Sequence, residues 1–177
     1  MTSIPSEPAA VTPAWLTGKL QAAGVLADAQ VSAIRWEPIG TGQVGDSARF
    51  HLSYDREGAG PATVAGKFPA ADAMSRGTAA AFGLYAKEVG FYRELAPQVD
   101  IRVPRAHVAE IADDGIEFVL IFEDLGPCRG GNQLDSCSLA DARAAMRQAA
   151  ALHAPSWNNA AIIATEWLKP REGLTEQ

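Results

Sequence analysis

Three closely spaced glycines follow the first predicted strand and constrain the fold more than any other feature. The stretch Ile39–Ser47 reads I-G-T-G-Q-V-G-D-S, which places Gly40, Gly42 and Gly45 at the spacing G-x-G-x-x-G. Glycines at this spacing let the backbone turn sharply and bring its N–H groups close to a phosphate. Two nucleotide-binding architectures use the spacing, and an ordinary hairpin can also contain it. The segments that follow must decide between these.

The glycines are expected to join two strands. Val31–Ile39 has the composition of a strand, and Ala48–Tyr54 alternates apolar and polar residues with a period of two. A dinucleotide-binding fold needs a helix after the glycines, so this context excludes it. A P-loop is excluded as well, because Pro61 stands where its first glycine would be and Phe68 follows Lys67. The remaining nucleotide-binding architecture is the kinase hairpin that folds over the phosphates.

That architecture predicts a lysine in the third strand, a glutamate on the next helix and a short linker after the fifth strand. Lys67 stands near the end of the predicted strand Ala62–Phe68. Glu88 and Glu94 are both available, and Glu88 is favoured because an acid near the last helical turn opposes the helix dipole. Phe122–Leu125 is the candidate linker.

The rest of the chain is predicted to alternate helices, strands and loops. One helix begins at the capping pair Thr12-Pro13, and another begins at Ser138 and ends near His153. The longest predicted helix, Ala79–Ala96, carries apolar residues at three- and four-residue steps. The other predictions are a loop over Ala70–Thr78, strands over Val103–Ile111 and Gly115–Phe122, and a last helix from Trp157.

Composition excludes several classes of protein. The chain has 177 residues, 47% of them hydrophobic, so it can bury a sizeable core and general disorder is not expected. A net charge of −6 argues against nucleic acid as a partner. No apolar run approaches the ~20 residues of a membrane span, so no membrane partner is expected.

The first eleven residues lack a signal-peptide pattern and are expected to be a disordered leader. Cys128 and Cys137 form neither a disulfide framework nor a zinc pattern, so no metal site is predicted and a cytoplasmic location with reduced thiols is favoured.

Several segments resemble small-molecule kinases of the aminoglycoside phosphotransferase and choline kinase-like group, which includes the ecdysteroid kinase-like branch. One helix of that group is similar to Lys87–Pro97, which reads K-E-V-G-F-Y-R-E-L-A-P. The linker of the group is similar to Phe122–Leu134, which reads F-E-D-L-G-P-C-R-G-G-N-Q-L. A-A-A-L-H-A-P-S-W (Ala149–Trp157) is similar to the end of its next helix. The resemblance implies an α+β fold with a protein-kinase-like N-lobe, that is, a five-stranded antiparallel sheet with one packed helix. It also implies bound ATP and transfer of the γ-phosphoryl group to a hydroxyl of a small acceptor.

The resemblance also implies roles for individual residues. The hairpin would cover the phosphates, Lys67 would contact the α- and β-phosphates, and Glu88 would pair with Lys67. Backbone atoms of Glu123 and Leu125 would hold the adenine, while His153 would be structural. The hairpin residues are Gly40, Thr41, Gly42, Gln43, Val44 and Gly45.

The chain departs from the family in one respect. It contains no H-G-D-x-x-x-x-N-like segment and no later aspartate motif, so ligands for Mg²⁺ would come from a further part of the enzyme. We therefore expect a leader over 1–11, an ATP-binding lobe over 12–122, a linker over 123–137 and the start of an incomplete second lobe over 138–177. The 177 residues alone are predicted to be inactive, and the acceptor is not identified.

Two interpretations of the whole chain remain open at this point. It is the N-terminal part of a longer kinase, or it is a short protein that binds a nucleotide or a protein partner without catalysis. The helix after Ser138 carries an apolar stripe, which favours the first interpretation because such a stripe needs a covering partner. The stripe consists of Ala145, Met146, Ala149 and Leu152.

Overall fold

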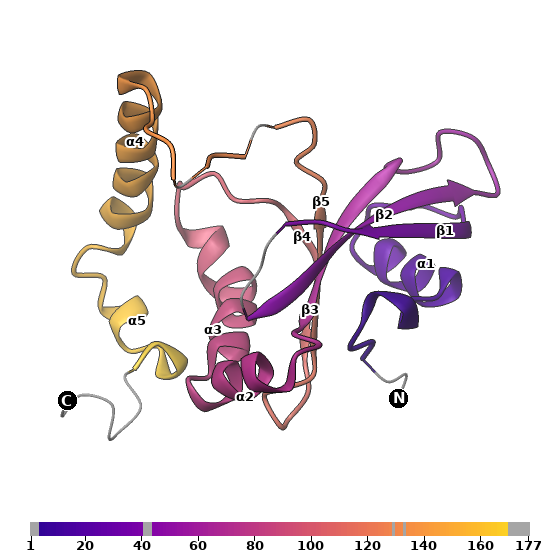
Figure 1. Cartoon of the computed structure of the whole chain (residues 1–177), viewed down its shortest axis with the longest axis horizontal. Coiled ribbons are helices and arrows are strands. Elements are labelled where there is room, and N and C mark those ends of the chain that lie inside the picture. The colour runs from indigo at the N-terminus through magenta and orange to yellow at the C-terminus, as the bar shows by residue number, and fades with distance from the viewer. Residues whose placement is uncertain (1–3, 41–43, 129, 133, 170–177) are drawn as a thin grey trace. The chain divides into compact units, whose positions relative to one another are not determined.

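The computed structural model describes residues 4–40, 44–128, 130–132 and 134–169. The chain divides into two compact units. The first contains Met1–Val89 and Pro104–Asp124, and the second contains Gly90–Val103 and Leu125–Gln177. Helices and strands are both present, so the predicted α+β class is confirmed (Figure 1).

An open, five-stranded antiparallel sheet forms the centre of the first unit. Its strand order is β1-β2-β3-β5-β4, which puts β3 in the middle. The predicted antiparallel sheet is confirmed, and each strand differs from its predicted bounds by at most a few residues. The strands are β1 (Val31–Pro38), β2 (Gly45–Tyr54), β3 (Thr63–Pro69), β4 (Ala106–Ile111) and β5 (Phe118–Glu123).

The register of the sheet separates its two faces. Phe50 lies directly opposite Val64, so these side chains share one face, whereas Ser47 lies opposite Lys67 on the other. The first face is apolar and packs against α1 (Pro13–Ala22), whose Leu16 and Leu20 are fully buried in the same core cluster. Lys67 therefore projects from the face that α1 does not cover.

The N-terminal segment differs from expectation. As predicted, Thr12 caps α1, and its hydroxyl accepts a hydrogen bond from the Trp15 N–H at 3.2 Å. The expected disordered leader is wrong for residues 4–11, because Pro8–Ala10 form a 3₁₀ turn and Val11 is only 6% exposed. Val11 and Ile4 pack on the α1 core, and a burial of this kind is not visible as a periodic pattern in so short a segment.

The helices after β3 also differ from expectation. The predicted loop over Ala70–Thr78 contains α2 (Ala73–Ala81), which starts where the Asp72 carboxylate accepts a hydrogen bond from the Ser75 N–H at 2.7 Å. The single predicted helix over Ala79–Ala96 is wrong as well. Gly83 has a φ of +62°, and this left-handed residue separates α2 from α3 (Leu84–Gly90). A π-helical turn over Phe91–Leu95 and a 3₁₀ turn over Ala96–Gln98 follow.

The second unit contains α4 (Leu139–Ser156), α5 (Ala160–Ile163) and a 3₁₀ turn over Glu166–Leu168. Ser138 caps α4 as predicted, but the helix continues beyond His153 with Pro155 in its last turn. The backbone N–H of Asp100 donates to the carbonyl of Ala151 at 3.0 Å, which ties Gly90–Val103 to α4.

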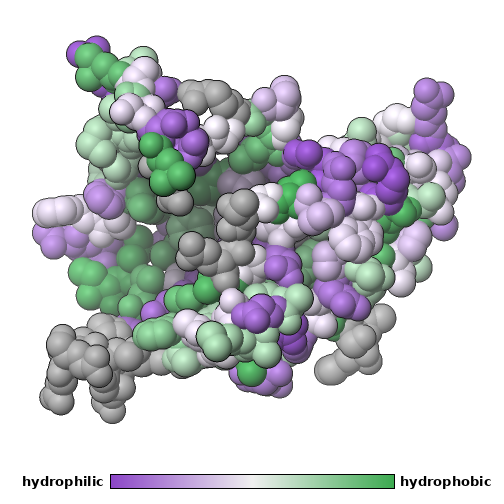
Figure 2. Space-filling view, viewed as in Figure 1, coloured by the Kyte–Doolittle hydropathy of each residue, from purple (hydrophilic) through white to green (hydrophobic). Residues whose placement is uncertain are grey.

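The second unit leaves large apolar side chains exposed. Met146 is 66% exposed, Trp157 76% and Ile163 65%, and Figure 2 shows hydrophobic residues at the surface over α5. None of these helices is a membrane span: in the described part of the chain, no helix combines the length and the apolar character that crossing a bilayer requires.

Candidate functional site

A lysine–glutamate ion pair lies on the central strand of the sheet. Lys67 is in β3, between Ser47 of β2 and Leu120 of β5. Its Nζ donates to Oε1 of Glu88 at 2.6 Å and to Oε2 at 2.8 Å, so both carboxylate oxygens are engaged. The other candidate, Glu94, accepts a hydrogen bond from the indole of Trp167 instead, at 2.8 Å. The structure thus brings Lys67 together with the glutamate that the sequence favours.

Gly45, the last glycine of the G-x-G-x-x-G spacing, lies against the side chain of Lys67. A Cβ atom on Gly45 would come within 3.2 Å of Lys67 Cε and 3.1 Å of the Phe68 carbonyl oxygen. A side chain at position 45 would therefore displace the lysine stem. Gly40 has a φ of +74°, the left-handed conformation that glycine adopts readily. Val44 is half-buried, and Thr41, Gly42 and Gln43 lie outside the described residues.

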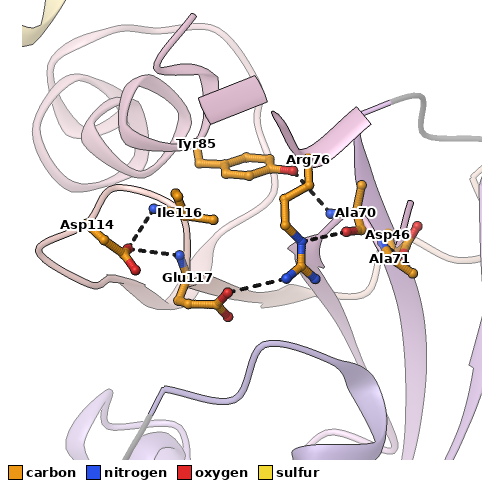
Figure 3. A network of polar contacts seen from close by, with 8 residues as sticks. All are labelled: Asp46, Ala70, Ala71, Arg76, Tyr85, Asp114, Ile116 and Glu117. Carbon is orange, nitrogen blue, oxygen red and sulfur yellow. Dashed lines mark hydrogen bonds and ion pairs between the residues drawn. The ribbon is translucent and has the colours of Figure 1, made fainter. Parts of the chain in front are cut away.

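Tyr85 fixes the position of α3 on this side of the sheet. Its ring is 1% exposed and lies 4.5 Å, centroid to centroid, from the ring of Phe118. Its hydroxyl accepts a hydrogen bond from the Ala70 N–H at 3.1 Å (Figure 3). Glu88 follows Tyr85 by three residues, so both side chains lie on the same side of the helix. The anchoring of Tyr85 therefore places Glu88 beside Lys67.

The loop after β3 is held by a polar network that the sequence did not predict. Asp46 accepts from the Ala71 N–H at 2.8 Å, and Arg76 Nε donates to the Ala70 carbonyl at 2.8 Å (Figure 3). Arg76 also reaches the carboxylate of Glu117 at 3.4 Å. The Asp114 carboxylate in turn accepts from the N–H groups of Ile116 and Glu117. Arg76 fell in a predicted loop, so the sequence gave no sign of its contacts.

A second ion pair lies on the Lys67 face. Arg49 occupies the position directly opposite Ala65 and donates to both carboxylate oxygens of Asp124, at 2.6 and 3.2 Å. The Asp124 side chain is 10% exposed, and its hydrogen bond raises the pKa of Arg49 above its ordinary value. This pair connects β2 to the residue that follows β5, across the central strand.

His51 of β2 has a hydrogen-bond partner on this face. Its Nε2 lies 3.1 Å from Oε1 of Glu37 on β1. This hydrogen bond lowers the pKa of the Glu37 carboxyl. With Arg35 and Arg49, these residues give the β1–β2 end of the face a charged surface, and Figure 2 shows hydrophilic residues gathered over β1 and β2.

The two linker residues predicted to hold adenine differ in their surroundings. The N–H of Glu123 donates to the Arg105 carbonyl at 2.9 Å, and its carboxylate accepts from the Arg105 N–H at 2.9 Å. Leu125 is 42% exposed, and its carbonyl accepts from the Cys128 N–H at 2.8 Å. The adenine contact of these residues stays a prediction.

The remaining candidate residues lie apart from the ion pair in the sequence. Cys128 and Cys137 are exposed free thiols, and His153 is an exposed residue of α4. Among the residues that the structure describes, no three His, Cys, Asp or Glu side chains are grouped so as to hold a metal ion.

Comparison with known proteins adds no relative. No protein-family model matches the chain, and no curated protein sequence matches it. The interpretation of the site therefore depends on the order of the sequence segments and on the geometry around Lys67.

Proposed function

We propose that the first unit is a protein-kinase-like N-lobe that binds ATP and belongs to a phosphotransferase acting on a hydroxyl of a small molecule. The observation that carries the proposal is the Lys67–Glu88 pair beside Gly45. A lysine held in this way on a central strand, next to a hairpin with the G-x-G-x-x-G spacing, is the arrangement that positions ATP phosphates in kinases.

The residues present fit the triphosphate of ATP. Lys67 supplies a cation whose Nζ is held at one place by two hydrogen bonds, and its side chain is 27% exposed, so a phosphate oxygen can reach it. Glu88 would keep the ammonium group oriented while the phosphates bind, and Gly45 would allow the hairpin backbone to approach them. When bound, ATP supplies the phosphoryl group that is transferred.

The described residues do not fit Mg²⁺ in the same way, because they offer no grouped ligands. The residues that orient the acceptor hydroxyl and hold magnesium in phosphoryl transfer have no counterpart in the sequence motifs of this chain. The role proposed for the chain is accordingly nucleotide binding and orientation of the phosphates.

A titration with ATP and magnesium, followed by thermal unfolding and by calorimetry, tests this function. We expect ATP to raise the unfolding temperature and the Lys67→Met variant to lose most of that shift. The matched control is Lys19→Met, because Lys19 of α1 pairs with Glu110 at a similar exposure, 27% for the lysine in both pairs, on the other side of the sheet. Equal responses of the two variants would contradict the role of Lys67. The absence of any response in the unmodified chain at millimolar ATP would favour a protein-interaction module.

A further inference from the structure

Arg49, Ala65 and Phe122 form a row across β2, β3 and β5, on the face from which Lys67 projects. Arg49 lies directly opposite Ala65, and Ala65 lies opposite Phe122. Lys67 and Ala65 are two residues apart on β3, so Lys67 lies about 6.6 Å from this row along the strand. Because β5 is antiparallel to β3 and ends at Glu123, the row lies between Lys67 and the linker. A nucleotide that reaches from Lys67 toward the linker would place its base over this row.

The side chain of Arg49 crosses the central strand above Ala65. β3 separates β2 from β5 in the sheet, and neighbouring strands lie about 4.8 Å apart. Arg49 nevertheless contacts Asp124, the residue that follows β5, so its side chain must extend over β3. The small methyl group of Ala65 leaves room for this path. The guanidinium group of Arg49 therefore lies above the row where the base is expected.

The edges of this guanidinium group face carboxylates of the protein. Nε and Nη2 of Arg49 donate to the two carboxylate oxygens of Asp124, and Nη1 lies 3.9 Å from Oε1 of Glu37 on β1. Phosphate oxygens bind a guanidinium group through the N–H groups along its edges, so Arg49 is poorly oriented to bind the phosphates of ATP. Its side chain is 31% exposed, and its flat face is the part that can contact a planar ligand.

We propose that the guanidinium group of Arg49 stacks on the base of the bound nucleotide, and that Asp124 and Glu37 hold the group in the required orientation. This inference rests on the proposed function, because it concerns the base of the nucleotide whose phosphates lie at Lys67. Arginine stacks readily on the π-face of a base, and such a contact does not depend on the hydrogen-bonding pattern of the base. Arg49 is thus a base-binding residue, whereas Lys67 binds phosphates.

Two substitutions of Arg49 separate stacking from the ion pair. Arg49→Lys keeps a cation near Asp124 but removes the flat group, and it should weaken ATP binding about 3- to 30-fold. Arg49→Phe keeps a flat group but cannot pair with Asp124, and it should retain most of the affinity. Calorimetric titration with ATP and magnesium measures both values. Unchanged affinity in Arg49→Lys, or equal losses in the two variants, would overturn the inference.

Inorganic tripolyphosphate, which has the phosphates of ATP but no base, shows which part of the nucleotide Arg49 contacts. Arg49→Lys should leave tripolyphosphate affinity unchanged, and a loss equal to that for ATP would overturn the inference. The matched control is Arg35→Lys, because Arg35 is an exposed arginine of β1 that lies opposite His51 on the same face. It should change neither affinity, and a loss of ATP affinity as large as that in Arg49→Lys would contradict a specific role of Arg49.

The same titrations separate failure of this inference from failure of the proposed function. ATP binding that requires Lys67 but is unaffected by both Arg49 substitutions would remove only the stacking contact. ATP binding that is unaffected by Lys67→Met would remove the proposed phosphate site, and the inference with it.

Discussion

Gly66 and Gly77 differ in how much space surrounds their Cα atoms. A Cβ on Gly66 of β3 would lie 2.6 Å from Phe50 Cε2 and 2.9 Å from Phe68 Cε2, two rings that pack edge to face in the core. A Cβ on Gly77 of α2 would meet no atom within 4 Å. Gly66 is therefore required by close packing, whereas Gly77 only adds conformational freedom to a helix.

Alanine at these two positions should change stability in opposite directions. We expect Gly66→Ala to lower the free energy of unfolding by about 1–3 kcal/mol, because the added methyl group displaces the rings. Gly77→Ala should raise it by about 0.5–1 kcal/mol, because alanine has the higher helix propensity. Urea denaturation of both variants measures the two changes. A neutral effect of Gly66→Ala would show that the rings shift without loss of packing.

His107 of β4 links the stability of the first unit to pH. Its Nδ1 is buried and has no hydrogen-bond partner among the described residues. Burial lowers the pKa of this imidazole below 6.5, and Arg105 lowers it further, while Glu123 opposes the change. The unfolded chain therefore binds a proton on His107 more readily than the folded chain does.

The sign of the pH dependence follows from this difference. The stabilisation by neutral His107 is complete above pH 6.5 and is lost as the pH falls below 6.5 toward the folded-state pKa. His107→Gln should reduce the slope of unfolding free energy against pH in that window, measured by urea denaturation at several pH values. The control is His153→Gln, since His153 is exposed on α4. An unchanged slope for His107→Gln would show that other groups dominate this window.

At the scale of elements, strands with clear signals could be predicted and packing-dependent helices could not. β2 and β5 carry strong alternating or continuous apolar runs, and the kinase architecture that the order of strands around the hairpin indicated predicted Lys67 beside Glu88. Apart from Met74, the apolar residues of α2 are alanines, so the segment has no stripe of large apolar side chains that would reveal a helix. Its formation depends on the Asp72 cap and on contacts of Arg76 that involve residues far away in the sequence.

In the candidate site as well, some contacts could be predicted from the sequence and others could not. The Lys67–Glu88 pair was predicted from the kinase architecture, which the glycine spacing and the strand order indicated. The Arg49–Asp124 pair joins residues 75 positions apart, and the network of Asp46, Tyr85 and Arg76 closes only when the loop after β3 folds back onto the sheet. No local pattern marks these residues, because each contact depends on the register of the completed sheet.

At the scale of the whole molecule, the two units differ in how much their elements bury. Five of the six residues of β5 are buried, and α1 buries Leu16, Thr17 and Leu20. The 18-residue helix α4 has no buried residue. Because opening free energies follow burial and contact with the core, backbone hydrogen bonds in α4 should open far more often than those in α1.

Native-state hydrogen exchange, read by mass spectrometry on peptides, measures this difference directly. We expect amides of β5 to exchange slowest and those of α4 to exchange at least about 100-fold faster than those of α1. The comparison of α4 with α1 is between two helices, so it separates the effect of burial from that of helical hydrogen bonding. Equal protection of the two helices would mean that α4 is covered in solution, and the exposed side chains of Met146 and Trp157 would then lie within the covered surface. Dilution distinguishes the source of such a cover: protection that falls at low protein concentration comes from association between copies of the chain, and protection that stays constant comes from within one copy.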